Sequence, residues 1–453
     1  MQPLPKEFEE QMKRLLGEAG FFAYLDALNQ PYTRALRVNL LLRPDGTPSC
    51  PIEGLGAPVP WAKGAYFVEG DARPGLSPLH EGGLFYMQEP SALTAVTALD
   101  PQPGERVLDL CAAPGGKSTQ IAALMAGRGL LCCNEPIPSR AQILSRNIER
   151  MGVRNAVVLS AMPDALAPRF PAFFDRILVD APCSGEGMFR RQPEARDEWD
   201  ADAPRRCADR QMEILAQAAK MLRPGGTMVY STCTFNDTEN EGVLKRFLAL
   251  HPEFSLVPFA LPGLPEAKDG YLHLYPHEMR GEGHFVSRLK KADGADEADA
   301  PVQAAPQRKA PARAAAKGKA PVPIALPDVF SDAFAPERLY TAGDALWMLP
   351  EEISIERLSG LRVLRTGLLL AHAEGKRSEP DHALAMALRP EEAARTASLT
   401  QTQALAYQAG ETLSLGDLPG GYTLLCCEGV SLGWGKQASG LMKNHYPKGL
   451  RRR

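Results

Sequence analysis

Short apolar runs alternate with longer amphipathic segments between Val107 and about Leu250. The apolar runs predict strands, and the amphipathic segments predict helices. The apolar runs are RVLDL, GLLCCNE, NAVVLS, DRILVDAP and TMVYSTCT, and the helical segments are KSTQIAALMA, SRAQILSRNIERMG and RRCADRQMEILAQAAKML. Because strands that alternate with helices form parallel sheets covered on both faces, we predict an α/β fold here.

The pattern changes on both sides of this core, which we expect to span residues 81–291. Residues 1–80 read as helices followed by RALRVNLLL, which predicts a small N-terminal domain. Residues 292–323 are mainly Ala, Pro, Lys and Gly, and such a segment buries too little apolar surface to offset its chain entropy. We therefore predict a flexible linker there. Beyond it, short predicted strands and turns indicate two small domains, over 324–390 and 391–453.

The composition of the 453-residue chain narrows the class of protein. Hydrophobic residues make up 44%, yet no apolar run approaches the roughly 20 residues that span a membrane. The N-terminus lacks the apolar core of a signal peptide. The nine cysteines form neither a spaced disulfide framework nor a metal-binding motif. We expect a cytoplasmic protein with reduced thiols, no membrane contact and no metal site. The net charge of −3 argues against a uniformly basic nucleic-acid binder.

The segment DLCAAPGGKS (Asp109–Ser118) follows a predicted strand and begins a predicted helix. Backbone amides at such a position bind anionic or polar cofactor groups. A P-loop is one alternative, since Gly116, Lys117 and Ser118 match the end of that motif, but Cys111 occupies the place of its first glycine. A turn that serves only strand-to-helix packing is the other alternative.

Glu135 favours the cofactor interpretation. It ends the next predicted strand, near the offset of about 20 residues at which a carboxylate holds ribose hydroxyls. This arrangement indicates a cofactor that contains adenosine. Because no G-x-G-x-x-G motif is present, S-adenosylmethionine is favoured over NAD.

Two cysteines, Cys183 in DAPCSGEG and Cys233 in STCT, follow predicted strands directly. Ligands bind at this carboxyl edge of open α/β sheets. A thiolate beside a methyl donor suggests attack on C6 of a pyrimidine, which activates C5 for methylation. Asp180 is the nearest candidate for an acid or hydrogen-bond donor at N3. The other cysteines outside the cofactor loop are interpreted as small buried hydrophobes: Cys50, Cys132, Cys133, Cys207, Cys426 and Cys427.

The motifs DLCAAPGGKS, NEP, DAPCSGEGMFR and STCT resemble those of the NOL1/NOP2/Sun family of S-adenosylmethionine-dependent RNA cytosine-C5 methyltransferases. The segments LRVNLLL, GLFYMQEPSAL, LYPHEMRGEGHFVSRL and NHYPKGLRR are similar to the bacterial RsmF-type ribosomal RNA enzymes. The resemblance covers nearly the whole chain except the linker. It implies a class I methyltransferase with a Rossmann-like, mostly parallel sheet, an N-terminal RNA-binding domain and a C-terminal PUA-like RNA-binding region.

The resemblance also implies roles for individual residues. Cys233 would be the nucleophile and Cys183 would assist release of the methylated base. Glu135 would hold the ribose, and Asp180 would lie between cofactor and base. The cofactor would be lined by Cys111, Ala112, Ala113, Pro114, Gly115, Gly116 and Lys117. The opposite roles of the thiols stay open, since DNA cytosine-C5 enzymes place their nucleophile in a Pro-Cys motif.

One position departs from the family. An Asp that touches the adenine amino group often ends the third strand, but here Ala161 and Met162 occupy that place. Asp164 is close by and out of register.

Basic and aromatic residues near the motifs suggest RNA contacts. Arg190 and Arg191 follow the Pro-Cys motif, and the terminal segment combines Trp434, His445 and Tyr446 with several cations. The linker holds further cations, among them Lys309, Arg313, Lys317 and Lys319. The expected partner is ribosomal RNA, in particular small-subunit RNA, and the expected state is a monomer. Two alternatives are a noncatalytic RNA-binding or ribosome-assembly protein and a P-loop NTPase.

Overall fold

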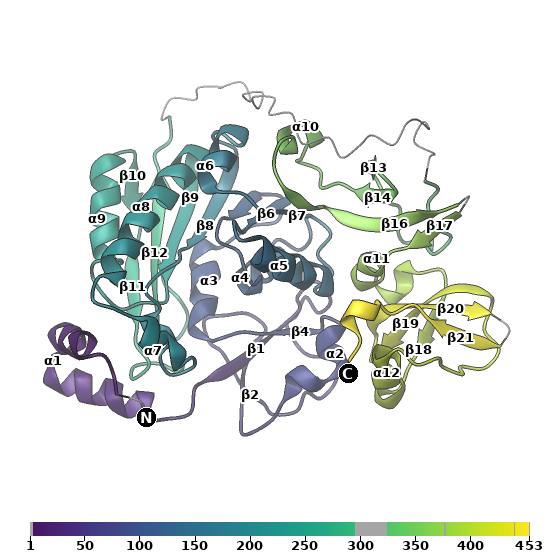
Figure 1. The fold of residues 1–453 in the computed structure, drawn as a ribbon, viewed down its shortest axis with the longest axis horizontal. Coiled ribbons are helices and arrows are strands. Elements are labelled where there is room, and N and C mark those ends of the chain that lie inside the picture. The colour runs from purple at the N-terminus through teal and green to yellow at the C-terminus, as the bar shows by residue number, and fades with distance from the viewer. Residues whose placement is uncertain (1–2, 295–323, 376, 439, 453) are drawn as a thin grey trace.

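A nine-stranded mixed sheet forms the centre of the molecule (Figure 1). The computed structural model describes residues 3–294, 324–375, 377–438 and 440–452. The strand order is β10-β12-β9-β8-β5-β6-β7-β15, with β11 paired to β12. Strands β5 to β9 are parallel, whereas β12 and β15 pair antiparallel with β9 and β7. The bounds are β5 Arg106–Asp109, β6 Leu130–Asn134, β7 Ala156–Leu159, β8 Phe174–Asp180, β9 Leu222–Thr232, β10 Phe254–Leu256, β11 Tyr271–Leu274, β12 His284–Lys291 and β15 Val363–Thr366. The predicted α/β fold class is confirmed.

Helices cover both faces of this sheet because successive strand side chains point to opposite sides. In β5, Val107 packs in one apolar cluster with Ile121 and Leu144, whereas Leu108 packs in the other with Leu215. The helices are α3 Thr94–Leu99, α4 Gly116–Leu124 and α5 Pro138–Arg150 on the first face, and α6 Pro163–Leu166, α8 Ala203–Met221 and α9 Glu241–Leu250 on the second.

The N-terminal unit consists of a long helix and a small antiparallel sheet. Helix α1 (Lys6–Leu28) is interrupted at Gly17, whose φ of +68° lies in the left-handed region that glycine tolerates best. The sheet has the order β2-β3-β1-β4 and includes a strand beyond residue 80. Its strands are β1 Arg34–Val38, β2 Leu55–Pro58, β3 Ala65–Val68 and β4 Phe85–Met87, and two short helical segments, η1 (Pro74–Leu76) and α2 (Pro78–Glu81), precede β4.

The C-terminal part forms two four-stranded sheets, β13-β14-β16-β17 and β18-β19-β20-β21. Strand β15 interrupts this division, since it pairs with β7 and so extends the central sheet. The strand bounds are β13 Leu339–Ala342, β14 Ala345–Met348, β16 Leu368–Glu374, β17 Arg377–Pro380, β18 Thr396–Ser398, β19 Gly421–Cys427, β20 Val430–Ala438 and β21 Leu441–Asn444. Three helices accompany them: α10 Ile355–Leu358, α11 His382–Ala387 and α12 Gln401–Ala409.

Two aromatic residues expected to contact RNA are instead part of the C-terminal core. Trp434 is 2% exposed and donates its indole N–H to the carbonyl of Asp381, 2.8 Å away. Tyr446 is 3% exposed and packs edge-on against His382 and Tyr407. The expectation that these two rings stack on RNA bases is therefore wrong, because their faces are covered by protein.

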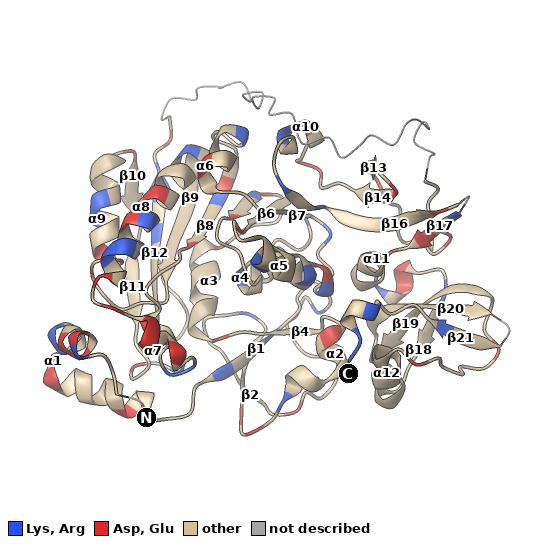
Figure 2. Ribbon diagram, in the orientation of Figure 1, with Lys and Arg blue, Asp and Glu red and all other residues tan. Residues whose placement is uncertain are grey.

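Most of the predicted linker, residues 295–323, lies outside the described residues, together with the cations named above. Across the described ranges, no helix is long and apolar enough to cross a membrane. Figure 2 shows Lys and Arg interspersed with Asp and Glu along the ribbon, in agreement with the small net charge.

Candidate active site

A pocket of about 370 Å³ lies where strands β5, β8 and β9 end. Strand β5 pairs with β6 on one side and with β8 on the other. The strands that follow β5 in the chain are therefore added first on one side of it and then on the other, so the strand order reverses at β5. Ligands bind at such switch points of open α/β sheets. The pocket is lined by the loop after β5, by Asp180 and Cys233, and by residues of the N-terminal unit and β12.

The loop between β5 and α4 is held from both sides. From α5, Asn147 donates to the carbonyl of Pro114 over 2.9 Å. From β1, the buried Arg37 donates to the carbonyl of Gly116 over 3.3 Å. Gly115 has a φ of +112°, and a Cβ there would lie 3.2 Å from Leu144. Six of the seven loop residues predicted to line the cofactor do line the pocket, and Gly115 instead allows the turn to approach α5.

Asp109, at the end of β5, lies beneath this loop. Its Oδ2 accepts a 2.6 Å hydrogen bond from the Ser118 hydroxyl. Within the described residues its buried Oδ1 has no hydrogen-bond partner. Burial raises the pKa of Asp109 to about 7, although the bond from Ser118 opposes that rise. The carboxyl group therefore gains or loses a proton near neutral pH.

Glu135 follows β6 and is almost completely buried. Its Oε1 accepts from the backbone N–H of Ile137, and its Oε2 lies 3.4 Å from the half-exposed Arg140. It is not among the residues that line the pocket. Met162 is exposed, as is Asp164 in the first turn of α6, so neither supplies a buried acid beside Glu135.

Lys117 and Asp180 form an ion pair of 2.7 Å inside the pocket. Burial alone would favour the neutral carboxylic acid, but Lys117 outweighs it and holds the pKa of Asp180 well below its usual range, with help from His284. Burial likewise opposes the ammonium, but Asp180 outweighs it and raises the pKa of Lys117. Both groups are therefore charged at neutral pH, and Asp180 accepts hydrogen bonds rather than donating them.

The two predicted thiols meet at the ends of adjacent strands. The Sγ atoms of Cys183 and Cys233 are 3.3 Å apart. Cys233 lines the pocket, whereas Cys183 is not among the lining residues. The Cys233 thiol and burial together raise the pKa of Cys183 well above its ordinary value, so Cys183 stays protonated. All nine cysteines of the chain are free.

A buried polar network supports both thiols from behind. The Glu239 carboxylate accepts from the backbone N–H of Ser184 at 3.0 Å, from Gln211 at 2.8 Å and from Asn236 at 2.8 Å. The hydroxyls of Ser184 and Thr234 share a 2.8 Å hydrogen bond. Because Ser184 follows Cys183 and Thr234 follows Cys233, this network fixes the two cysteine segments relative to each other.

Sequence reasoning missed several residues of this pocket. His284 at the start of β12 is buried, and its Nε2 lies 3.5 Å from Asp180. Gln88 and Glu89, which follow β4, line the pocket from the N-terminal unit. The quoted segments GLFYMQEPSAL and GEGHFVSRL contain all three, but no local pattern indicated that they reach the strand ends.

Arg190 does not face RNA as expected. Its side chain is 7% exposed, and its guanidinium pairs with Glu282 at 2.7 Å and donates to the carbonyl of Ala27. It therefore ties α1 to the loop before β12. Arg191, in contrast, is exposed and lines the pocket.

Comparisons with known proteins agree with this geometry. Residues 96–290 match the 16S rRNA methyltransferase RsmB/F model, and 4–90 match the N-terminal domain of 16S rRNA methyltransferase RsmF. Residues 328–388 match the first C-terminal domain of the RsmF rRNA methyltransferase, and 394–452 match the methyltransferase RsmF PUA domain.

Similar full-length proteins and solved structures narrow the family to which the chain belongs. Ribosomal RNA small subunit methyltransferase F of Erwinia tasmaniensis is 33% identical over 98% of this chain and 96% of its own. The crystal structure of a methyltransferase homolog protein from Pyrococcus horikoshii is 30% identical, with a TM-score of 0.53, and the match covers 63% of this chain and 95% of that one. NSun6 from Pyrococcus horikoshii shares the fold at 23% identity, with a TM-score of 0.55 over 64% of this chain and 98% of that one.

The sheet order, the loop after β5 and the matched core define a class I methyltransferase of the RsmB/F group. The resemblance read from the sequence motifs is thereby confirmed. Within that group, the chain belongs to the ribosomal RNA small subunit methyltransferase F family, with a PUA domain at its C-terminus.

Proposed function

We propose that this protein transfers a methyl group from S-adenosylmethionine to C5 of a cytosine in small-subunit ribosomal RNA. The observation that carries the proposal is the pair of thiols, 3.3 Å apart, next to the Lys117–Asp180 ion pair. The names of the relatives support ribosomal RNA as the substrate. As in the sequence prediction, we propose a cytoplasmic monomer.

The residues around the loop fit the proposed cofactor. The amino end of α4 offers unpaired backbone N–H groups to a carboxylate, and most of the loop lines the pocket. Among the described residues, Oε2 of Glu135 has only the half-exposed Arg140 as a partner, so a ribose hydroxyl is able to replace Arg140 there. When bound, S-adenosylmethionine supplies an electrophilic methyl group.

The Lys117–Asp180 pair matches the hydrogen-bonding edge of cytosine. The Asp180 carboxylate would accept from the exocyclic amino group, and the Lys117 ammonium would donate to N3 or O2. This replaces the expectation that Asp180 donates at N3, because Asp180 is held ionised. Uracil presents an oxygen where cytosine has its amino group, so the carboxylate would disfavour uracil.

The thiols would perform the two halves of the reaction. The Cys233 thiolate adds to C6, and the developing charge on N3 and O2 is stabilised by Lys117. C5, made nucleophilic by this addition, would then be the acceptor for the methyl group that bound S-adenosylmethionine would supply. Loss of the C5 proton to water would re-form the C5–C6 double bond and break the C6–S bond. Cys183, which stays protonated 3.3 Å from the departing sulfur, would donate a hydrogen bond to that sulfur and so stabilise it as a leaving group.

Two other functions receive less support. A noncatalytic RNA-binding protein would have no need for two thiols, an ion pair and a cofactor loop in one pocket. A P-loop NTPase is opposed by Cys111, which occupies the place of the first glycine of that motif.

The test compares 5-methylcytosine in ribosomal RNA from cells with and without this gene, and labelled methyl transfer with the purified protein. Cys233→Ala is expected to abolish transfer and adduct formation, whereas Cys183→Ala is expected to retain an RNA–protein band on a denaturing gel. A band from Cys233→Ala alone would reverse the two roles. Full methylation by both variants without any band would refute the covalent mechanism.

A further inference from the structure

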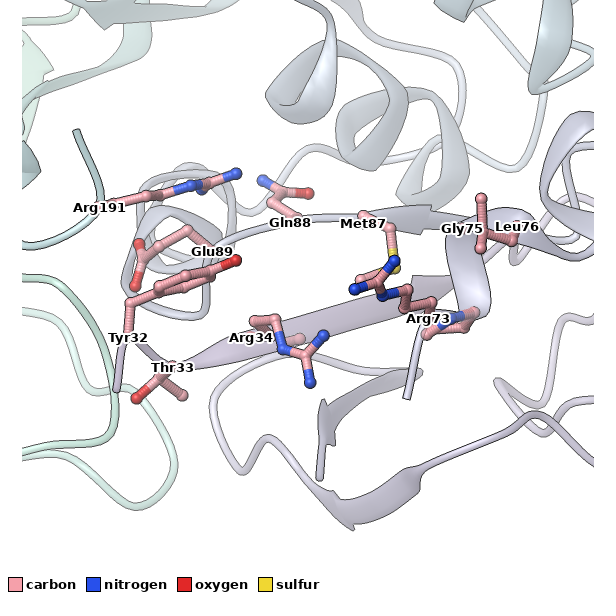
Figure 3. Close-up of a pocket in the computed structure, with 12 residues that line it drawn as sticks. Tyr32, Thr33, Arg34, Arg73, Gly75, Leu76, Met87, Gln88, Glu89 and Arg191 are labelled. Carbon is pink, nitrogen blue, oxygen red and sulfur yellow. The ribbon is translucent and has the colours of Figure 1, made fainter. Parts of the chain in front are cut away.

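A second pocket, of about 320 Å³, lies on the N-terminal unit beside the active site (Figure 3). Met87, Gln88, Glu89 and Arg191 line both pockets, so the two share a wall. The second pocket therefore lies next to the site that the target base would enter. Of the residues that line it, only Arg191 is expected from the sequence to contact RNA.

The charge of the second pocket favours an anion. Three guanidinium groups line it, those of Arg34, Arg73 and Arg191. Arg34 is held by the carbonyls of Ala72 and Gly70. Arg73 and Arg191 are exposed, and neither guanidinium has a hydrogen-bond or ion-pair partner among the described residues.

Glu89 supplies the one carboxylate among the residues that line this pocket. Its oxygens accept hydrogen bonds from the backbone N–H groups of Ser91, Ala92 and Glu282, and from the Ser91 hydroxyl. These donors compensate much of its negative charge. The two unpaired guanidinium groups therefore dominate the pocket and suit a phosphate.

Tyr32 adds a surface for a base. Tyr32, on the segment between α1 and β1, is 46% exposed, and Leu76 on the opposite wall is 64% exposed. Figure 3 shows the Tyr32 ring beside Glu89 and the Arg73 side chain beside Met87, around one common space. An exposed aromatic ring beside unpaired guanidinium groups provides both stacking and phosphate binding, the two elements of single-stranded RNA recognition.

We propose that this pocket binds the nucleotide next to the target cytosine, with its base on Tyr32 and its phosphate between Arg73 and Arg191. The inference rests on the proposed function, because it presumes that RNA enters the Cys233 pocket. It adds a subsite that holds the strand while the target base reacts.

The test uses the full chain with Tyr32→Ala and Arg73→Gln, since both side chains are exposed and neither lines the active-site pocket. Phe22→Ala and Arg14→Gln are matched controls, because they remove an exposed aromatic ring and an exposed guanidinium from α1, away from both pockets. KM and kcat are measured by labelled methyl transfer to unmethylated 16S ribosomal RNA. Each pocket variant is expected to raise KM about tenfold with kcat unchanged. This is the result expected when the lost contact binds the substrate and the transition state equally well.

Salt dependence and a modified RNA sharpen the result. Arg73→Gln should reduce the slope of log Kd against log salt by about 0.7, the value for one phosphate contact on a single strand. Two synthetic RNA fragments carry an abasic site directly 5′ or directly 3′ of the methylated cytosine. Tyr32→Ala should raise KM on one of these fragments and leave KM unchanged on the other, where the base that stacks on Tyr32 is already missing.

KM values equal to those of the α1 controls, or a full Tyr32→Ala effect on both abasic fragments, would overturn the subsite. Failure of the wild-type protein to methylate C5 would instead refute the proposed function. Binding of the same RNA to the wild-type and variant proteins would still report on the pocket in that case.

Discussion

Replacing Glu239 by alanine is expected to impair release of the product without touching either thiol. Glu239 is fully buried and holds the backbone N–H of Ser184, the residue that follows Cys183. Without that acceptor the Cys183 segment loses its fixed position opposite Cys233. The variant should therefore accumulate the RNA–protein adduct, as Cys183→Ala is expected to do.

The cost in stability follows from the partners of Glu239. Its carboxylate accepts from Ser184, Gln211 and Asn236. Gln211 keeps a second acceptor in the carbonyl of Pro182, and Asn236 keeps Thr234 and Glu186. The Ser184 N–H alone is left unsatisfied, at a cost of about 1–3 kcal/mol, with about 1 kcal/mol for each of the other two bonds. Since burial raises the pKa of Glu239, relief of that desolvation offsets part of the loss. We expect the free energy of unfolding to fall by about 3 kcal/mol.

The assay pairs urea unfolding with the denaturing gel. Leu130→Ala is the matched control. Leu130 is fully buried at the start of β6, and so lies at the edge of the sheet opposite the thiols. Its truncation lowers the free energy of unfolding by about 2–5 kcal/mol. It should lose stability without retaining adduct. If Glu239→Ala loses stability yet releases RNA as fast as Leu130→Ala does, the network does not position Cys183.

Three further predictions concern the cofactor, the sheet and a buried acid. Glu135→Ala should weaken S-adenosylmethionine binding by roughly 1.5–3 kcal/mol, because a charge-assisted hydrogen bond to ribose is lost; calorimetry measures this, and unchanged affinity would remove Glu135 from the site. Cleavage at a protease site inserted between residues 295 and 323 should leave the two fragments associated in gel filtration. The reason is that β15 pairs with β7, and the buried Arg365 pairs with Glu149, across the cut. Separate elution of the fragments at low salt would contradict this association. Burial raises the pKa of Asp109 to about 7, so from about pH 4 to 7 the folded state keeps a proton that the unfolded chain has lost, and stability falls as pH rises. Asp109→Asn should remove up to about 4 kcal/mol of that pH dependence, measured by urea unfolding across the range, and parallel curves for the two proteins would show that Asp109 titrates normally.

The sequence by itself determined the type and order of the central elements. Alternation of apolar runs and amphipathic segments is a local property, and β5 to β9 lie where it predicted strands. It also determined that the cofactor loop, Asp180, Cys183 and Cys233 share one edge of the sheet, because the carboxyl ends of parallel strands coincide. Motif identity then indicated the family, which the relatives confirm.

Only the tertiary structure decided which segments meet across long separations. The 3.3 Å approach of the thiols depends on the pairing of β8 with β9 and on a network that includes Gln211. The same holds for His284 beside Asp180 and for β15 on the edge of the central sheet. Burial also depends on segments that are distant in the sequence. Trp and Arg are residue types that often contact RNA, but residues from distant segments cover Trp434 and Arg190. Local periodicity carries no record of these contacts, since they arise from strand order and packing between segments far apart in the chain.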